Sequence, residues 1–106
     1  MKLGVIISTS EPETVWNALR FANFSLKQGD VVKVFLMGLG VDYQSTSTEK
    51  FNTSIQAETF LDNGGSLFAC GTCIKSRQKA ESDMCPLSTM QDMYDIVTTS
   101  DKVVTF

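Results

Sequence analysis

The chain contains no histidine, and it has only three cysteines among its 106 residues. The missing imidazole excludes cysteine–histidine hydrolysis, because that chemistry needs a base beside the nucleophile. Zinc is also disfavoured, since Cys70, Cys73 and Cys85 supply only three of the four ligands of a structural site. A Gly-rich phosphate loop is absent too, because Gly38-Leu39-Gly40 lacks the third glycine and the helix start of a dinucleotide fingerprint. We therefore expect neither a metal nor a cofactor.

Positive charge and long apolar runs are scarce as well. Nine Lys and Arg against 12 Asp and Glu give a net charge of −3. Nucleic-acid binders concentrate Lys and Arg to displace counterions, so nucleic acid is a poor candidate partner. The start, MKLGVIISTSEPE, has too short an apolar stretch for a signal peptide or a membrane span. We expect a cytoplasmic protein with no membrane partner.

The length of the chain fits one compact domain spanning residues 1–106. Hydrophobic residues at 42% and charged residues at 20% are ordinary values for a folded domain, which argues against disorder. A domain this small gains from self-association, and Trp16 with seven phenylalanines exceeds what its own core needs. The composition therefore favours a homo-oligomer.

Apolar runs that are typical of strands alternate with helical patterns along the chain. The expected strands are 2–8, 31–37, 66–69 and 102–106. The expected helices begin at Ser10-Glu11-Pro12-Glu13, Phe51, Thr72 and Ser88-Thr89-Met90-Gln91, and they extend to about Gly29, Leu61, Lys79 and Val97. Strands that alternate with helices predict an α/β fold built of βαβ units, with a mostly parallel sheet covered on both faces.

The segment FACGTCIKSR, residues 68–77, runs from the end of the third expected strand into the helix that follows. Reactive groups in open α/β sheets collect at the carboxyl ends of strands. Cys70 therefore lies at that edge, where the first turn of the next helix favours a thiolate. Lys75 and Arg77 follow and add positive potential. These features make Cys70 the candidate nucleophile, with Cys73 and Arg77 beside it.

Three interpretations of the two cysteines stay open on the residues alone. Cys70 is a lone nucleophile, or Cys70 and Cys73 form a redox dithiol, or both are small buried hydrophobes in a binding subunit without chemistry. Cys-Gly-x-Cys before a helix is also the thioredoxin signature. That motif comes early in thioredoxin-type folds, whereas here it follows two complete βα units.

The order of these elements, with FACGTCIKSR and TTSDKVVTF as its most specific parts, resembles the DsrE/DsrF-like family and its YchN-like members over nearly the whole chain. The resemblance implies a three-layer α/β/α sandwich around a sheet of about five strands, assembled into a homo-oligomer such as a trimer or hexamer. It also implies a sulfur carrier or sulfurtransferase. Cys70 matches the cysteine that carries sulfane sulfur as a persulfide from a donor protein to an acceptor protein.

Cys73 keeps the dithiol alternative open within this resemblance. It lies one helical turn from Cys70, close enough to resolve a persulfide to a disulfide and release sulfide. The long loop 38–48 is expected to shape the same rim, where Asp42 and Tyr43 are the residues most able to contact a substrate. Cys85 is expected to be structural.

Overall fold

The computed structural model describes residues 1–77, 82 and 84–106 and confirms the expected α/β class. The strands are β1 (Lys2–Ile7), β2 (Val31–Leu36), β3 (Ser66–Cys70), β4 (Leu87–Ser88) and β5 (Lys102–Thr105). The helices are α1 (Pro12–Lys27), the 3₁₀ helix η1 (Gly38–Asp42), α2 (Thr53–Asp62), α3 (Gly71–Ser76) and α4 (Met90–Thr99). The five strands form one sheet in the order β4-β3-β2-β1-β5, and every neighbouring pair is parallel.

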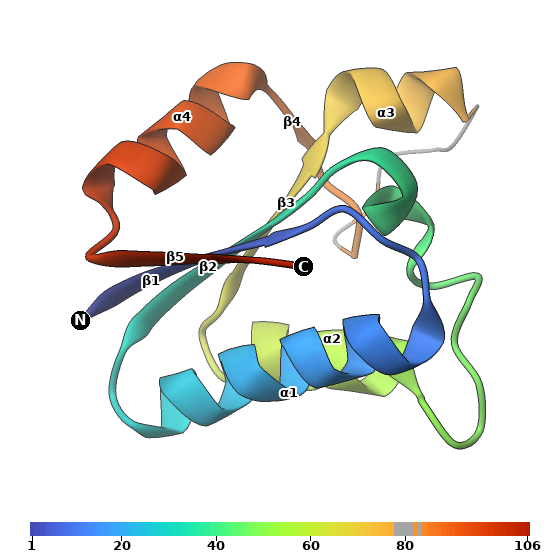
Figure 1. Cartoon of the computed structure of the whole chain (residues 1–106), viewed down its shortest axis with the longest axis horizontal. Coiled ribbons are helices and arrows are strands. Elements are labelled where there is room, and N and C mark those ends of the chain that lie inside the picture. The colour runs from blue at the N-terminus through green and yellow to red at the C-terminus, as the bar shows by residue number, and fades with distance from the viewer. Residues whose placement is uncertain (78–81, 83) are drawn as a thin grey trace.

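The helices cover both faces of the sheet and make a three-layer sandwich (Figure 1). α1 and α2 lie on one face, and α3 and α4 lie on the other. The strand β1 is buried on both sides, with Leu3, Val5 and Ile7 in the core under α1 and α2. Ile6 points the other way and joins a smaller cluster with Phe35, under α4. Burial on both faces explains why the strand reads as a continuous apolar run.

Two helices begin one residue later than expected, because in each the N-cap is the residue that follows the expected serine. Glu11 caps α1 in place of Ser10, and its carboxylate accepts from the backbone N–H groups of Glu13 and Thr14 at 3.1 and 2.7 Å. Thr89 caps α4 and forms a capping box with Asp92. Ser88 belongs to β4 instead, where its hydroxyl accepts from the backbone of β3. A hydroxyl used between strands is not free to cap a helix.

Three further differences concern short elements. The loop expected at 38–48 opens with η1. β4 completes the expected sheet of about five strands, but the pattern of residues did not place it, because two residues are too short to show a strand period. The third helix ends at Ser76 instead of continuing to Lys79. Residues 78–81 and 83, which include that expected end, lie outside the described residues.

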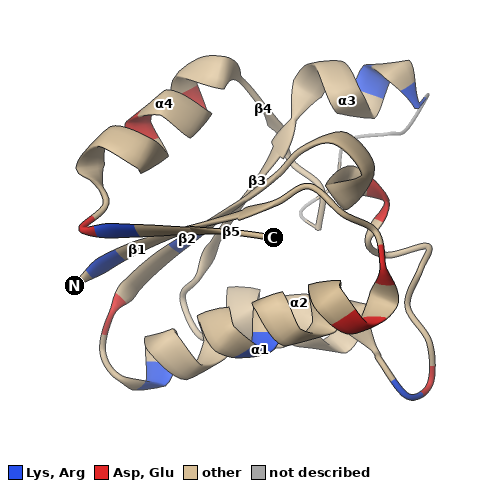
Figure 2. Ribbon diagram, viewed as in Figure 1, with Lys and Arg blue, Asp and Glu red and all other residues tan. Residues whose placement is uncertain are grey.

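Length and polarity set the helices apart from membrane spans. None of the helices in the described ranges is both long enough and apolar enough to cross a bilayer. Charged residues are scattered over the helices and loops, as Figure 2 shows. The helix α4 carries Asp92 and Asp95 and no basic residue.

The turn after β2 is held against the end of β1 by a close backbone approach. Gly40, in η1, is buried, and a Cβ built on it would collide with the backbone carbonyl oxygen of Ile7. Backbone cannot move aside as a flexible side chain does. Glycine is therefore required here by space, and this contact fixes where η1 lies at the carboxyl edge of the sheet.

Gly40→Ala should push η1 away from β1. Overpacking of this kind costs about 1–3 kcal/mol, and thermal unfolding should show the midpoint falling by about 4–8 °C per kcal/mol. Gln44→Ala, at an exposed position just beyond η1, is the matched control and should change the midpoint little. Equal midpoints for Gly40→Ala and wild type would contradict the close approach.

Candidate functional site

Cys70 lies at the carboxyl edge of the sheet, as the sequence predicts. It is the last residue of β3 and the N-cap residue of α3. Its side chain faces the α4 side of the sheet, in the cluster with Ile6, Phe35 and Ile96, and the residue is only 5% exposed. Its thiol makes no capping hydrogen bond to the backbone of α3, a six-residue helix that the structure describes in full. The helix start therefore does less for Cys70 than the sequence suggests.

Cys73 lies one turn further on and is partly exposed. Its Sγ accepts a hydrogen bond from the backbone N–H of Gly38 at 3.2 Å. Burial raises the pKa of the Cys73 thiol, and a hydrogen bond with Cys70 raises it further. The Gly38 N–H and the Arg77 guanidinium lower this pKa without cancelling the rise. The pKa of the Cys73 thiol therefore lies above its usual value.

Arg77 is beside the cysteine pair, but its contacts differ from those expected. Its Nε donates to Asp42 Oδ2 at 3.0 Å, in an ion pair that is about three-quarters buried on both sides. Its Nη1 donates to the carbonyl oxygen of Cys73 at 3.3 Å. The guanidinium therefore links the end of η1 to the turn that carries Cys73.

The two loop residues expected to contact a substrate have different environments. Tyr43 is 1% exposed, and its hydroxyl donates to the carbonyl oxygen of Met84 at 2.6 Å. Burial raises the pKa of its phenol well above the usual range. Tyr43 is therefore a core residue, and its predicted contact with a substrate is wrong. Asp42 stays at the rim, in the ion pair with Arg77.

Cys85 is separate from the other two cysteines. It is 4% exposed in the larger core, and its Sγ lies 3.8 Å from the carbonyl oxygen of Val41. These contacts agree with the structural role expected for it. Across the described ranges, no three Cys, Asp or Glu side chains come close enough together to hold a metal ion.

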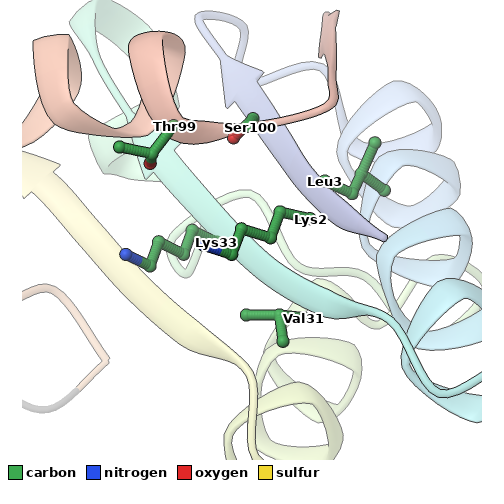
Figure 3. Close-up of a pocket in the computed structure, with 6 residues that line it drawn as sticks. All are labelled: Lys2, Leu3, Val31, Lys33, Thr99 and Ser100. Carbon is green, nitrogen blue, oxygen red and sulfur yellow. The ribbon is translucent and has the colours of Figure 1, made fainter.

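Of two surface hollows, one adjoins the site and the other lies away from it. One of about 310 Å³ lies between the starts of α3 and α4 and is lined by residues that include Gly71, Thr72 and Met90. It adjoins the turn that Cys70 opens. A smaller hollow of about 60 Å³ lies at the amino ends of β1 and β2, with the side chains of Lys2 and Lys33 along it (Figure 3). That hollow is at the opposite edge of the sheet from the thiols.

The sequence did not reveal the part that Gly38 plays in the site. A backbone N–H has no side-chain signature, and 35 residues separate Gly38 from Cys73. The same separation divides Asp42 from Arg77. The one available signal was a long loop leaving the carboxyl end of a strand next to the cysteine strand.

Comparisons with known proteins cover the whole chain. The family model described as the DsrE/DsrF-like family matches residues 1–106. The uncharacterized protein MJ0989 of Methanocaldococcus jannaschii is 34% identical, with 100% of both chains covered. The uncharacterized protein MK0008 of Methanopyrus kandleri is 32% identical, covering 98% of this chain and 93% of its own. The crystal structure of the ychN protein from E. coli has the same fold, with a TM-score of 0.84 at 24% identity and 100% of both chains covered.

Alkylation of Cys73 by iodoacetamide should have an apparent pKa above that of glutathione. Below both pKa values the two thiols are protonated and unreactive; between them glutathione ionises while Cys73 keeps its proton. Rates measured by peptide mass spectrometry over a pH series give the midpoint. The urea-unfolded chain is the control and should match glutathione, whereas a folded-state midpoint at or below that of glutathione would contradict the protonated Cys73.

Proposed function

Because the chain belongs to the DsrE/DsrF-like family, we propose that it acts in sulfur relay and carries sulfane sulfur as a persulfide on Cys70. The observation that carries this proposal is the unequal thiol pair at the carboxyl edge of the sheet. Cys73 keeps its proton and hydrogen-bonds to Cys70. Attack by Cys70 needs its thiolate, which is the nucleophilic form, and Cys73 with its raised thiol pKa is the weaker competitor for that role.

The transfer needs no oxidant or cofactor. The Cys70 thiolate attacks the outer sulfur of a persulfide on a donor protein, and the donor's own thiolate leaves with the electron pair of the broken S–S bond. The sulfane sulfur is then bonded to Cys70. A thiolate on an acceptor protein attacks that terminal sulfur in turn and releases Cys70 as a thiolate. The donor and the acceptor are the partner proteins that this role requires.

The burial of Cys70 limits which molecules reach it. The thiol is 5% exposed, and the half-buried Met37 and Met93 pack against its cluster. Methionine side chains are flexible, so a protein partner that docks at this edge opens the site by displacing them. Burial also shields a loaded persulfide from small thiols in the reducing cytoplasm, which we propose as the compartment.

The dithiol alternative is favoured by one specific observation. Cys70 and Cys73 are free thiols joined by a hydrogen bond, which is the arrangement that closes to a disulfide after a small local movement. In that case the protein exchanges two electrons with a partner disulfide and needs both cysteines. The carrier role needs Cys70 alone.

A homo-oligomer, as a trimer or hexamer, is the assembly we propose. Trp16 does not argue for it, because its ring packs against Phe51 with centroids 5.3 Å apart within the chain. The outer face of α4 does, since Met90, Tyr94 and Val97 lie at helical spacing and are 57%, 65% and 44% exposed. An apolar stripe of this kind is typical of a covered surface.

Tyr94→Lys should reduce the size of the assembly measured by light scattering during size-exclusion chromatography. A lysine in the centre of the α4 stripe would leave a charge unpaired in an apolar contact. Gln91→Lys adds the same charge on the same helix outside the stripe and is the control. A monomeric wild type, or an unchanged mass for Tyr94→Lys, would rule out this stripe as the self-contact.

The carrier role is tested by incubating the protein with a cysteine desulfurase and cysteine. Intact-protein mass spectrometry then measures the sulfur that the protein has gained. Wild type and Cys73→Ser should gain one sulfur atom, and Cys70→Ser should gain none, because Cys70 is the proposed carrier of the persulfide. A loss of two hydrogens with sulfide release in the wild type favours the dithiol alternative. Absence of any mass change in all three proteins would contradict the proposed function with this donor.

A further inference from the structure

We infer that Asp42 and Arg77 are positioning residues that hold Cys73 on the Gly38 amide and so keep it from attacking a persulfide carried by Cys70. For the persulfide itself, this inference rests on the proposed function. What it adds is an explanation of how a carrier cysteine can have a second cysteine one turn away without losing its sulfur.

The Arg77 guanidinium joins two segments that meet at the site. Nε donates to Asp42, the last residue of η1, at 3.0 Å, and Nη1 donates to the carbonyl oxygen of Cys73 at 3.3 Å. The exposed fractions of the Arg77 and Asp42 side chains are 27% and 24%, so the pair is only partly screened by water. One side chain therefore fixes the end of η1 relative to the backbone of Cys73.

The other end of η1 holds the Cys73 sulfur. The N–H of Gly38, the first residue of η1, donates to Sγ at 3.2 Å. η1 thus contacts the cysteine turn at both of its ends, through Gly38 on the thiol and through Asp42 on Arg77. Gly40, between them, is pressed against Ile7, so the short helix is backed by β1. Among the described residues, loss of the Asp42–Arg77 pair would leave η1 joined to the cysteine turn by the hydrogen bond from Gly38 to Cys73.

The reaction that this arrangement restrains is the resolution of the persulfide. The Cys73 thiolate would attack Sγ of Cys70, forming the Cys70–Cys73 disulfide while the bond from Cys70 to the sulfane sulfur breaks. The sulfane sulfur leaves with that electron pair as hydrosulfide and takes up the proton that Cys73 gave up, so no other oxidant is required. The attack needs Cys73 in its thiolate form. The Cys73 sulfur must also leave the Gly38 N–H and approach Sγ of Cys70 to the S–S bond length of about 2.05 Å. The raised pKa of the Cys73 thiol also opposes this step.

The test measures how fast Cys73 displaces a group from Cys70. In one arm the protein is loaded by desulfurase and cysteine, and released sulfide is followed. In the other, methyl methanethiosulfonate is added in mild urea, where local opening exposes Cys70, and the protein is returned to buffer. The species that fragmentation shows to carry one methylthio group on Cys70 is then followed for loss of methanethiol by mass spectrometry. The second arm imitates a persulfide chemically and does not depend on any natural donor.

Asp42→Ala and Arg77→Gln should each speed both reactions by about two- to fivefold, the effect of losing one partly exposed ion pair. The double variant should be no faster than the quicker single one, because the two residues act as a pair. Asp42→Glu should restore a rate near that of wild type. Cys73→Ser should abolish release in every background.

Two controls separate positioning from general loosening. Asp62→Ala removes an exposed acid at the end of α2, and Val15→Ala destabilises the core under α1, away from the site. Neither should change the release rates. Wild-type rates in Asp42→Ala, or an equal acceleration by Val15→Ala, would overturn the inference. If wild type takes no sulfur from the desulfurase, the proposed carrier function fails, while the methanethiol arm still decides whether Asp42 and Arg77 restrain Cys73.

Discussion

The hydrogen bond from the Gly38 N–H to the Cys73 sulfur is the interaction on which the candidate site depends. It exists because two neighbouring parallel strands end together at one edge of the sheet. The register pairs Leu36 with Ala69, so Met37 and Cys70, the next residues, lie side by side where the two strands end. The turns that follow are therefore in contact, and the backbone of one supplies a donor to the thiol of the other. A sequence with the same two cysteines on a different register would have no such contact.

The two cysteines beside this contact are chemically unequal, although the Gly38 N–H itself lowers the pKa of the Cys73 thiol. Cys73 is partly exposed, yet burial and its neighbour keep it protonated, while Cys70 is buried and receives the hydrogen bond. Exposure alone would point to Cys73 as the reactive thiol. The raised pKa of the Cys73 thiol argues against Cys73 and leaves Cys70 as the proposed nucleophile. In the proposed carrier role, access to Cys70 comes from a docked partner, which agrees with a site built for protein-to-protein transfer.

Much of the fold could be predicted from the sequence because its strands are buried on both faces and its helices are amphipathic. The runs at β1 and β2 and the placement of Cys70 at the end of β3 follow from that pattern. Features set by tertiary contact could not be predicted in this way. Ser88 was expected to cap a helix, but its hydroxyl serves β3, and Tyr43 was expected at the rim, but its ring fills the core. A polar side chain in a loop gives no local sign of whether its partner is water or a buried carbonyl.

The sequence likewise predicted the cysteine motif of the candidate site but not the residues that contact it. The motif shows Cys70, Cys73 and Arg77 next to one another, but their partners Gly38 and Asp42 come from a turn 35 residues earlier in the chain. The link becomes visible only when β2 and β3 are aligned. Arg77 was expected to add positive potential near Cys70, and the structure instead shows it bound to Asp42 and to the backbone of Cys73.

The most direct test of the carrier account is to locate the sulfane sulfur in the unmodified protein. After loading by a desulfurase, the peptide that contains both Cys70 and Cys73 is trapped with an alkylating reagent and fragmented in the mass spectrometer. The account predicts that the extra sulfur is bonded to Cys70, with Cys73 recovered as a singly alkylated thiol. Extra sulfur on Cys73, or a Cys70–Cys73 disulfide as the main product from the first time points, would contradict it.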